Sequence, residues 1–309
     1  MELIKNDTIM NIQHKLDYAI RDKAIRDKDG KPYPYGEGYI ISKSKLVYDR
    51  YMSNDGWDRY LAEMSEDHRK QYEEGDGGEI IEKRGRWGIY PPKMACYGSS
   101  SRIIYTLLRG VANIEFEKKL ATRVGHTANL DAYLQTGYTD IFLEAKSREI
   151  YASHTKIDIG DVYKPVYEYI KQCNKKFGYS DEPSKANNKF RCSFYYDGEQ
   201  IIRFDIKQLI CHYLAIAANY LKPLNGKDAM ANIRFVYFIY NPNELGKKTL
   251  DKVYDDTINE INKIGVIELN ELFKAVFEYQ KKNLEIEKEM PIFEFVHRAD
   301  QNNIIDKLK

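Results

Sequence analysis

The stretch that decides the fold reads ANLDAYLQTGYTDIFLEAKS and covers residues 128–147. Two runs rich in apolar residues, 128–134 and 139–147, are joined by Gln135-Thr136-Gly137-Tyr138, which has the composition of a tight turn. We therefore expect an antiparallel β-hairpin at this point. It is the clearest strand signal in the chain.

Ionisable side chains interrupt both expected strands of this hairpin. Asp131 lies in the middle of the first strand, and Glu144-Ala145-Lys146 closes the second. Because side chains alternate between the two faces of a strand, Glu144 and Lys146 share one face with Phe142, while Ala145 belongs to the other face. The carboxylate and the amine should therefore project together. Mg²⁺ usually takes one or two carboxylates together with water and substrate phosphate, and Asp131 and Glu144 are suitable ligands.

The order of elements around the hairpin predicts the fold class. Residues 99–120 should form a helix, because Ser99 to Ser101 are good N-caps and apolar residues recur at helical spacing after them. Further helices are expected at 159–171, 204–221, 248–263 and 268–282, strands at 190–196 and 233–240, a loop at 181–189, and a short apolar piece at 291–296. Such a mixed order is typical of an α/β fold with one mixed β-sheet flanked by helices. Residues 1–98 are polar and punctuated by turns, and we expect a mostly helical and irregular accessory region there.

Composition excludes several classes of protein. With 309 residues, 43% hydrophobic and 31% charged, the chain is neither fibrous nor disordered, and its net charge of +1 neither requires nor excludes a polyanionic partner. The four cysteines are too widely spaced for a zinc knuckle, and no phosphate-binding glycine motif indicates a nucleotide cofactor. No stretch approaches 18 consecutive apolar residues and the N-terminus is not a signal peptide, so we expect a cytoplasmic protein without membrane contact.

Asp131, the hairpin and Glu144-Ala145-Lys146, preceded by a helix with Glu117, resemble the PD-(D/E)XK nuclease superfamily, especially its type II restriction-endonuclease-like members. The resemblance covers residues 99–240 and implies a restriction-endonuclease-like nuclease domain at 99–309. It implies that Asp131 and Glu144 bind Mg²⁺, for which Mn²⁺ would substitute, and that Lys146 orients or deprotonates the attacking water. Leu130 stands where the motif name has Pro, a position at which many members vary.

Two further positions follow from the resemblance. Phe116-Glu117-Lys118-Lys119-Leu120 is similar to a segment that carries a catalytic glutamate on the helix before the hairpin. On a regular helix, however, Glu115 projects closer to the apolar stripe than Glu117 does, so Glu115 remains the rival. Lys207-Gln208-Leu209 is similar to a glutamine-bearing segment of the following helix, which makes Gln208 a supporting residue next to the site.

An acidic residue two positions before a lysine also occurs at Asp29, Glu117 and Asp205, but these three differ from Glu144 in their expected structural context. Those three lie in an expected turn, inside a helix and at a helix start. A cross-strand salt bridge on a solvated face is the competing interpretation of the hairpin charges.

Residues 146–191 carry ten Lys or Arg against six Asp or Glu, which suits phosphate contacts but also solvated helix faces. His154, eight residues after Lys146, is more typical of a surface residue than of a phosphate contact.

The resemblance implies a Mg²⁺-dependent endonuclease that hydrolyses phosphodiester bonds of double-stranded DNA, as restriction endonucleases do in defence against foreign DNA. A homodimer is expected, because two symmetric sites cut both strands. One alternative is a repair or recombination nuclease acting on branched or single-stranded nucleic acid. The other is a non-catalytic nucleic-acid-binding protein that keeps the fold.

Overall fold

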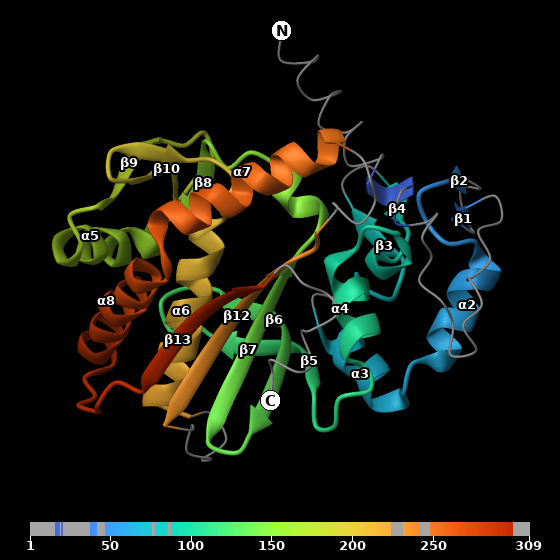
Figure 1. The fold of residues 1–309 in the computed structure, drawn as a ribbon, viewed down its shortest axis with the longest axis horizontal. Coiled ribbons are helices and arrows are strands. Elements are labelled where there is room, and N and C mark those ends of the chain that lie inside the picture. The colour runs from blue at the N-terminus through green and yellow to red at the C-terminus, as the bar shows by residue number, and fades with distance from the viewer. Residues whose placement is uncertain are drawn as a thin grey trace, which may run out of the picture.

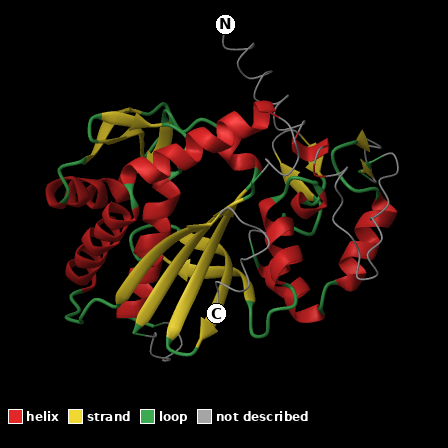
Figure 2. Cartoon of the chain, viewed as in Figure 1, coloured by secondary structure: helices red, strands yellow, loops and turns green. Residues whose placement is uncertain are grey.

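The computed structural model describes residues 16–18, 20, 38–41, 47–75, 78–85, 88–223, 231–241 and 248–298. Within them the chain is mixed α/β, with a five-stranded mixed sheet flanked by helices (Figure 1, Figure 2). In these residues we find no helix with the length and apolar character that a membrane span requires.

The central sheet has the strand order β13-β12-β7-β6-β5. Strands β5, β6 and β7 form an antiparallel meander, β12 pairs in parallel with β7, and β13 pairs in parallel with β12. The bounds of the strands are Glu115–Ala121 for β5, Thr127–Thr136 for β6, Thr139–Lys146 for β7, Asn232–Ile239 for β12 and Ile292–Arg298 for β13. Strand β7 is therefore the centre of the sheet, and its side chains are buried on both faces from Asp140 onward.

The expected hairpin is confirmed as β6 and β7. Thr136 pairs with Thr139, which leaves Gly137 and Tyr138 as a two-residue loop. Gly137 has a φ of 53°, the left-handed conformation that the first loop residue of a type II′ turn requires and that glycine adopts without strain.

Helices α6 and α8 pack on the sheet and on each other, and α7 packs on α8. Helix α6, Ile206–Leu221, packs against β5, β6 and α8, and most of its residues are buried, as its apolar sequence predicts. Helices α7, Lys248–Ile264, and α8, Val266–Leu284, lead from β12 back to β13. These elements confirm the predicted helices at 204–221, 248–263 and 268–282 and the strand at 233–240, and the apolar piece at 291–296 becomes the edge strand β13.

A second, smaller antiparallel sheet follows the central hairpin. Strand β10, Lys189–Tyr196, confirms the strand predicted at 190–196 and pairs with β8, β9 and β11. Its partners are β8 at Ile157–Gly160, β9 at Phe177–Pro183 and β11 at Glu199–Ile201. The short 3₁₀ helix η2, Arg148–Tyr151, lies between β7 and β8. A second one, η3, Asp161–Tyr163, and the helix α5, Lys164–Cys173, lie between β8 and β9.

Two predictions in this segment were wrong at their boundaries. The helix predicted at 159–171 begins only at Lys164, where Pro165 occupies the first turn, and residues 159 and 160 belong to β8. The loop predicted at 181–189 begins with the end of β9, whose last three residues, Asp181, Glu182 and Pro183, are exposed. Polar residues in an exposed strand have no alternation that sequence reasoning could detect.

The helix predicted at 99–120 is confirmed in its first part and was wrong after Leu108. Helix α4 runs from Ser100 to Leu108, with Ser99 accepting the backbone N–H of Arg102 as its N-cap. Gly110 follows its end, and Asn113 takes a left-handed φ of 60° that redirects the chain into β5. Glu115 and Glu117 therefore lie on a strand instead of a helix.

The N-terminal region contains helices and short ribbons. Its elements are β1 at Tyr39–Ile40, β2 at Val47–Tyr48, α2 at Asn54–Glu63, α3 at Glu66–Glu74, β3 at Lys83–Gly85, β4 at Gly88–Tyr90 and η1 at Lys93–Ala95. An aromatic cluster joins this region to α4 and β5: Tyr72 stacks on Phe116, and Tyr60 and Tyr72 both meet the ring of Tyr105 edge-on. The region thus shares one hydrophobic core with the central sheet.

Candidate active site

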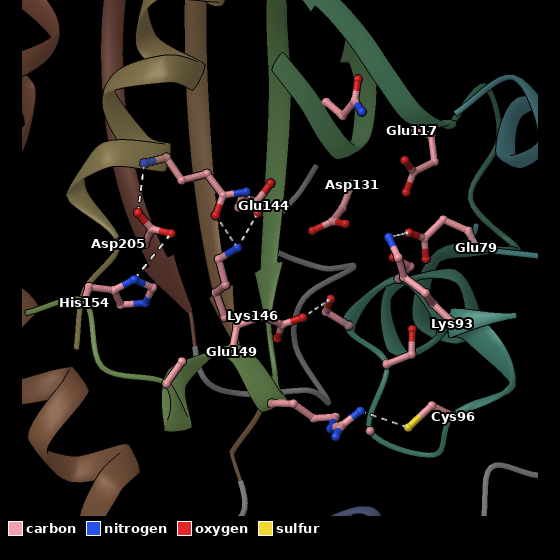
Figure 3. A pocket seen from close by; sticks show the side chains of 18 of the residues that line it. Glu79, Lys93, Cys96, Glu117, Asp131, Glu144, Lys146, Glu149, His154 and Asp205 are labelled. Atoms are coloured by element: carbon pink, nitrogen blue, oxygen red, sulfur yellow. Dashed lines mark hydrogen bonds and ion pairs between the residues drawn. The ribbon is translucent and has the colours of Figure 1, made fainter. Parts of the chain in front are cut away.

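A cavity of about 630 Å³ lies beside the carboxyl end of β7 (Figure 3). Its walls come from the N-terminal region, from the sheet strands β5 to β7, from the segment after β7 and from the first turn of α6. Asp131, Glu144, Lys146, Glu117 and Gln208 all line it.

Asp131 is fixed where β6 separates from β7. The paired register of these strands starts at Ala132 and Leu143, so Asp131 lies just beyond the ladder. Its Oδ2 accepts the backbone N–H of Ala145 at 2.6 Å, which replaces the ladder bond that the separation removes. The carboxylate is thereby held against β7.

Glu117 reaches the same cavity from an interrupted position of the β5–β6 ladder. Phe116 pairs with Ala132 and Lys118 pairs with Leu130, so the register is unbroken and Glu117 lies opposite Asp131. Its φ of 50° is left-handed, a conformation that costs a non-glycine residue about 1–2 kcal/mol. Its side chain lies in the cavity near Asp131, as Figure 3 shows. Backbone strain of this kind clusters at functional sites.

Glu144 and Lys146 form the centre of a buried hydrogen-bond network with α6. Lys146 Nζ lies 2.6 Å from Glu144 Oε1 and also donates to Gln208 Oε1. Gln208 Nε2 donates to Glu144 Oε1 at 2.8 Å. His212, one helical turn after Gln208, places Nε2 3.1 Å from Glu144 Oε2. Two side chains of one helix thus hold the carboxylate and the amine in place.

The electrostatics of the site fix the charges of this pair. Burial alone would raise the pKa of Glu144, but Lys146 and His212 more than offset it and lower that pKa to about 2. Burial opposes the charge on Lys146, yet Glu144 raises the pKa of its ammonium above the ordinary value. Both groups are therefore charged at neutral pH.

Asp131 is in the opposite situation. Burial, Glu144 and Glu117 all raise its pKa well above the ordinary carboxyl value, and the Lys146 charge and the Ala145 N–H only partly offset them. A buried carboxylate crowded by two others lacks positive charge at its oxygens. A divalent cation would supply that charge.

The donor chemistry of these residues fits a hard cation. Among the residues that the structure describes, no three Asp, Glu, His or Cys side chains are close enough to hold a metal ion together. Mg²⁺ does not need three, since it commonly keeps several waters and uses one or two carboxylates. Asp131 with Glu144 or Glu117 meets that requirement.

The structure separates the two rival glutamates. Glu117 lines the cavity, whereas Glu115 is not among its lining residues and forms an ion pair with Lys118 at 2.5 Å. The expectation that either residue lies on a helix was wrong: both belong to β5, where the cross-strand register, and not helical spacing, places Glu117 opposite Asp131. His154 also lines the cavity, with Nδ1 3.9 Å from Asp205 Oδ2.

Sequence reasoning missed three residues of this site. His212 follows Gln208 by four positions, and the expected helix at 204–221 could have indicated that both face the hairpin. Glu79 and Lys93 line the cavity from the N-terminal region. No pattern in the sequence connects those two to the hairpin.

Compared with protein-family models, with curated proteins and with solved structures, the chain matches none.

Proposed function

We propose that this protein is a Mg²⁺-dependent endonuclease of restriction-endonuclease-like fold that hydrolyses phosphodiester bonds of double-stranded DNA. The observation that carries the proposal is the convergence of Asp131, Glu144 and Lys146, from two adjacent strands, on one cavity. A surface salt bridge between strands would be solvated, but here Glu144 and Lys146 are almost fully buried. That burial argues against the competing interpretation of the hairpin charges.

Each residue has a distinct part in the proposed reaction. Asp131 and Glu144 hold the cation, and Glu117 adds negative charge beside Asp131. When bound, Mg²⁺ polarises the phosphoryl oxygens and lowers the pKa of a bound water. Lys146 orients the attacking water and balances negative charge that develops on the phosphate, a role that suits an ammonium kept protonated by Glu144. Gln208 and His212 keep Glu144 and Lys146 in place.

The proposal extends to the setting of the reaction. We place the protein in the cytoplasm, where foreign DNA would be met, and propose a homodimer because two symmetric sites cut both strands of a duplex most simply. Native mass in solution tests the dimer independently of activity.

Cleavage of unmethylated plasmid and phage DNA tests the proposed function. We expect discrete fragments in Mg²⁺ and none in chelator. Asp131→Asn and Lys146→Gln should each lower the rate by at least about a hundredfold. Asp131→Asn retains an oxygen for the Ala145 N–H, so it should fold, and it should lose the rise in melting temperature that Mg²⁺ gives the unsubstituted protein.

Glu115→Gln is the matched control, because Glu115 shares β5 with Glu117 but lies outside the cavity; it should cleave normally. Cleavage that persists in chelator or in Asp131→Asn would overturn the proposal. Nicking, or selective cutting of branched or single-stranded DNA, would identify a repair or recombination nuclease instead. DNA binding without any cleavage would identify a non-catalytic protein.

A further inference from the structure

The cavity carries an excess of negative charge. Six carboxylates line it against three Lys or Arg side chains; the carboxylates are Glu79, Glu117, Asp131, Glu144, Glu149 and Asp205, and the cations are Lys93, Lys146 and Arg148. Each backbone phosphate of DNA adds another negative charge. A DNA strand that enters this cavity therefore needs protein cations that it can reach from solvent.

The three cations differ in how far they are exposed. The side chain of Lys146 is 8% exposed and is bound to Glu144. The side chain of Arg148 is 23% exposed and forms an ion pair with the buried Asp17. The side chain of Lys93 is 60% exposed, so of these three it is the one that presents its charge to an entering strand.

Lys93 is exposed but held in position. Its Nζ lies 2.6 Å from Glu79 Oε1, and the Glu79 side chain is only 7% exposed. The backbone N–H groups of Lys93 and Met94 donate to the carbonyls of Gly78 and Glu79, at 2.8 and 2.9 Å, so the two segments are bound to each other. An ammonium has three N–H donors, which suits it to a carboxylate and a phosphate oxygen at once.

The arrangement in space places Lys93 across the site from Lys146. In Figure 3 the two lysines lie on either side of Asp131, Lys146 on the sheet and Lys93 on the wall formed by the N-terminal region. A phosphodiester above the carboxylates would have an ammonium on each side.

We propose that Lys93 binds a backbone phosphate of the DNA substrate at the cavity wall opposite Lys146, and that Glu79 is its positioning residue. The inference rests on the proposed function and adds to it a phosphate-binding group from a region outside residues 99–240. The N-terminal region then forms part of the active site.

Salt dependence of DNA binding tests this inference in the full-length protein. Affinity for a short fluorescein-labelled duplex is measured by anisotropy over a range of salt concentrations. Ca²⁺, which takes the same class of oxygen ligands, replaces Mg²⁺ in this measurement. Lys93→Gln should weaken binding about tenfold and make the slope of log affinity against log salt shallower by about 0.9, the value for one lost phosphate contact. Lys93→Arg should restore the slope.

Lys70→Gln is the matched control. Lys70 is an exposed lysine of the same region, 3.9 Å from Glu74, and it does not line the cavity. Its slope should equal that of the unsubstituted protein. Cleavage in Mg²⁺ gives a second readout, in which Lys93→Gln raises KM for DNA more than it lowers kcat.

Two results would overturn the inference in different ways. If the unsubstituted protein cleaves DNA but Lys93→Gln keeps its slope and KM, Lys93 has no phosphate contact and the proposed function stands. If the unsubstituted protein neither cleaves nor binds DNA, the proposed function fails and the inference fails with it.

Discussion

At the scale of single residues, the site is built by exceptions to regular structure. Asp131 lies where β6 leaves the β7 ladder, and Glu117 lies opposite Asp131 with left-handed backbone. Each exception places a carboxylate in the same cavity. The motif around Glu144 and Lys146 was visible in the sequence because a strand alternates regularly. The left-handed backbone at Glu117 was not, because a single non-glycine residue with a positive φ leaves no composition or period that can be read in advance.

The strain at Glu117 leads to a prediction about stability. Glu117→Asn should raise the free energy of unfolding by about 1 kcal/mol, because asparagine tolerates a left-handed φ and the crowding of carboxylates around Asp131 is reduced. The same variant should lose Mg²⁺-dependent cleavage. Urea denaturation in chelator, together with the plasmid assay, measures both effects.

Glu115→Asn gives the comparison on the same strand. Glu115 has regular backbone and an ion pair with Lys118 whose side chains are partly exposed, so its loss should change stability by less than about 0.5 kcal/mol. If Glu117→Asn is the less stable of the two variants, the left-handed backbone at Glu117 is not a strained feature kept for the site.

At the scale of elements, α7 anchors the segment that leads into α6. The carboxylate of Glu260 on α7 accepts the backbone N–H groups of Ile202, Arg203 and Phe204, at 3.1, 2.7 and 2.9 Å. Helix α6 starts just after them and carries Gln208 and His212 to Glu144. Glu260 of α7 thus holds the segment that precedes α6, the helix that supplies Gln208 and His212 to the site.

Removal of that contact should affect both stability and catalysis. Glu260→Ala leaves three backbone donors without their carboxylate, and we expect it to lower the free energy of unfolding by about 2–3 kcal/mol. Displacement of Gln208 should lower kcat more than it raises KM. Asp256→Ala, at an exposed position of the same helix, should do neither. Equal effects of the two variants in urea titrations and cleavage kinetics would contradict this role of Glu260.

The elements that sequence could predict are those with a clear local pattern. The hairpin was predicted from two apolar runs joined by turn residues, β12 from a continuous apolar and aromatic run, and α6 from apolar residues at helical spacing. Strand β5 was predicted as part of a helix because apolar residues continue through it at helical spacing. Gly110 and Asn113, which end α4 and redirect the chain, lie inside that run. Local propensity was overridden there by the need to complete the sheet edge beside β6.

At the scale of the whole molecule, the N-terminal region and the sheet depend on one another. Tyr72 of α3 is buried against Phe116 of β5, the residue that precedes Glu117. The part that the N-terminal region plays in the cavity wall lay beyond sequence reasoning, since contacts between distant segments leave no trace in composition or spacing.

This shared core predicts one cooperative unfolding transition. Tyr72→Ala should lower the free energy of unfolding by about 3–5 kcal/mol, while Tyr72→Phe should lower it by less than about 1 kcal/mol because the hydroxyl makes only a long contact of 3.5 Å to the Ser101 carbonyl. Circular dichroism and tryptophan fluorescence, to which the buried Trp57 contributes, should report the same midpoint. Two separate midpoints would show that the regions fold independently.

The hairpin turn lies at the far end of β7 from the cavity. Tyr138 is 81% exposed, and no atom lies within 4 Å of the position that a Cβ on Gly137 would take. Thr139 and Lys146 are seven positions apart on the strand, which corresponds to a distance of about 23 Å at about 3.3 Å per residue. A cysteine or peptide tag placed in this turn would tether the protein to a bead with its cavity directed away from the surface, so that individual binding events could be watched on a stretched DNA molecule.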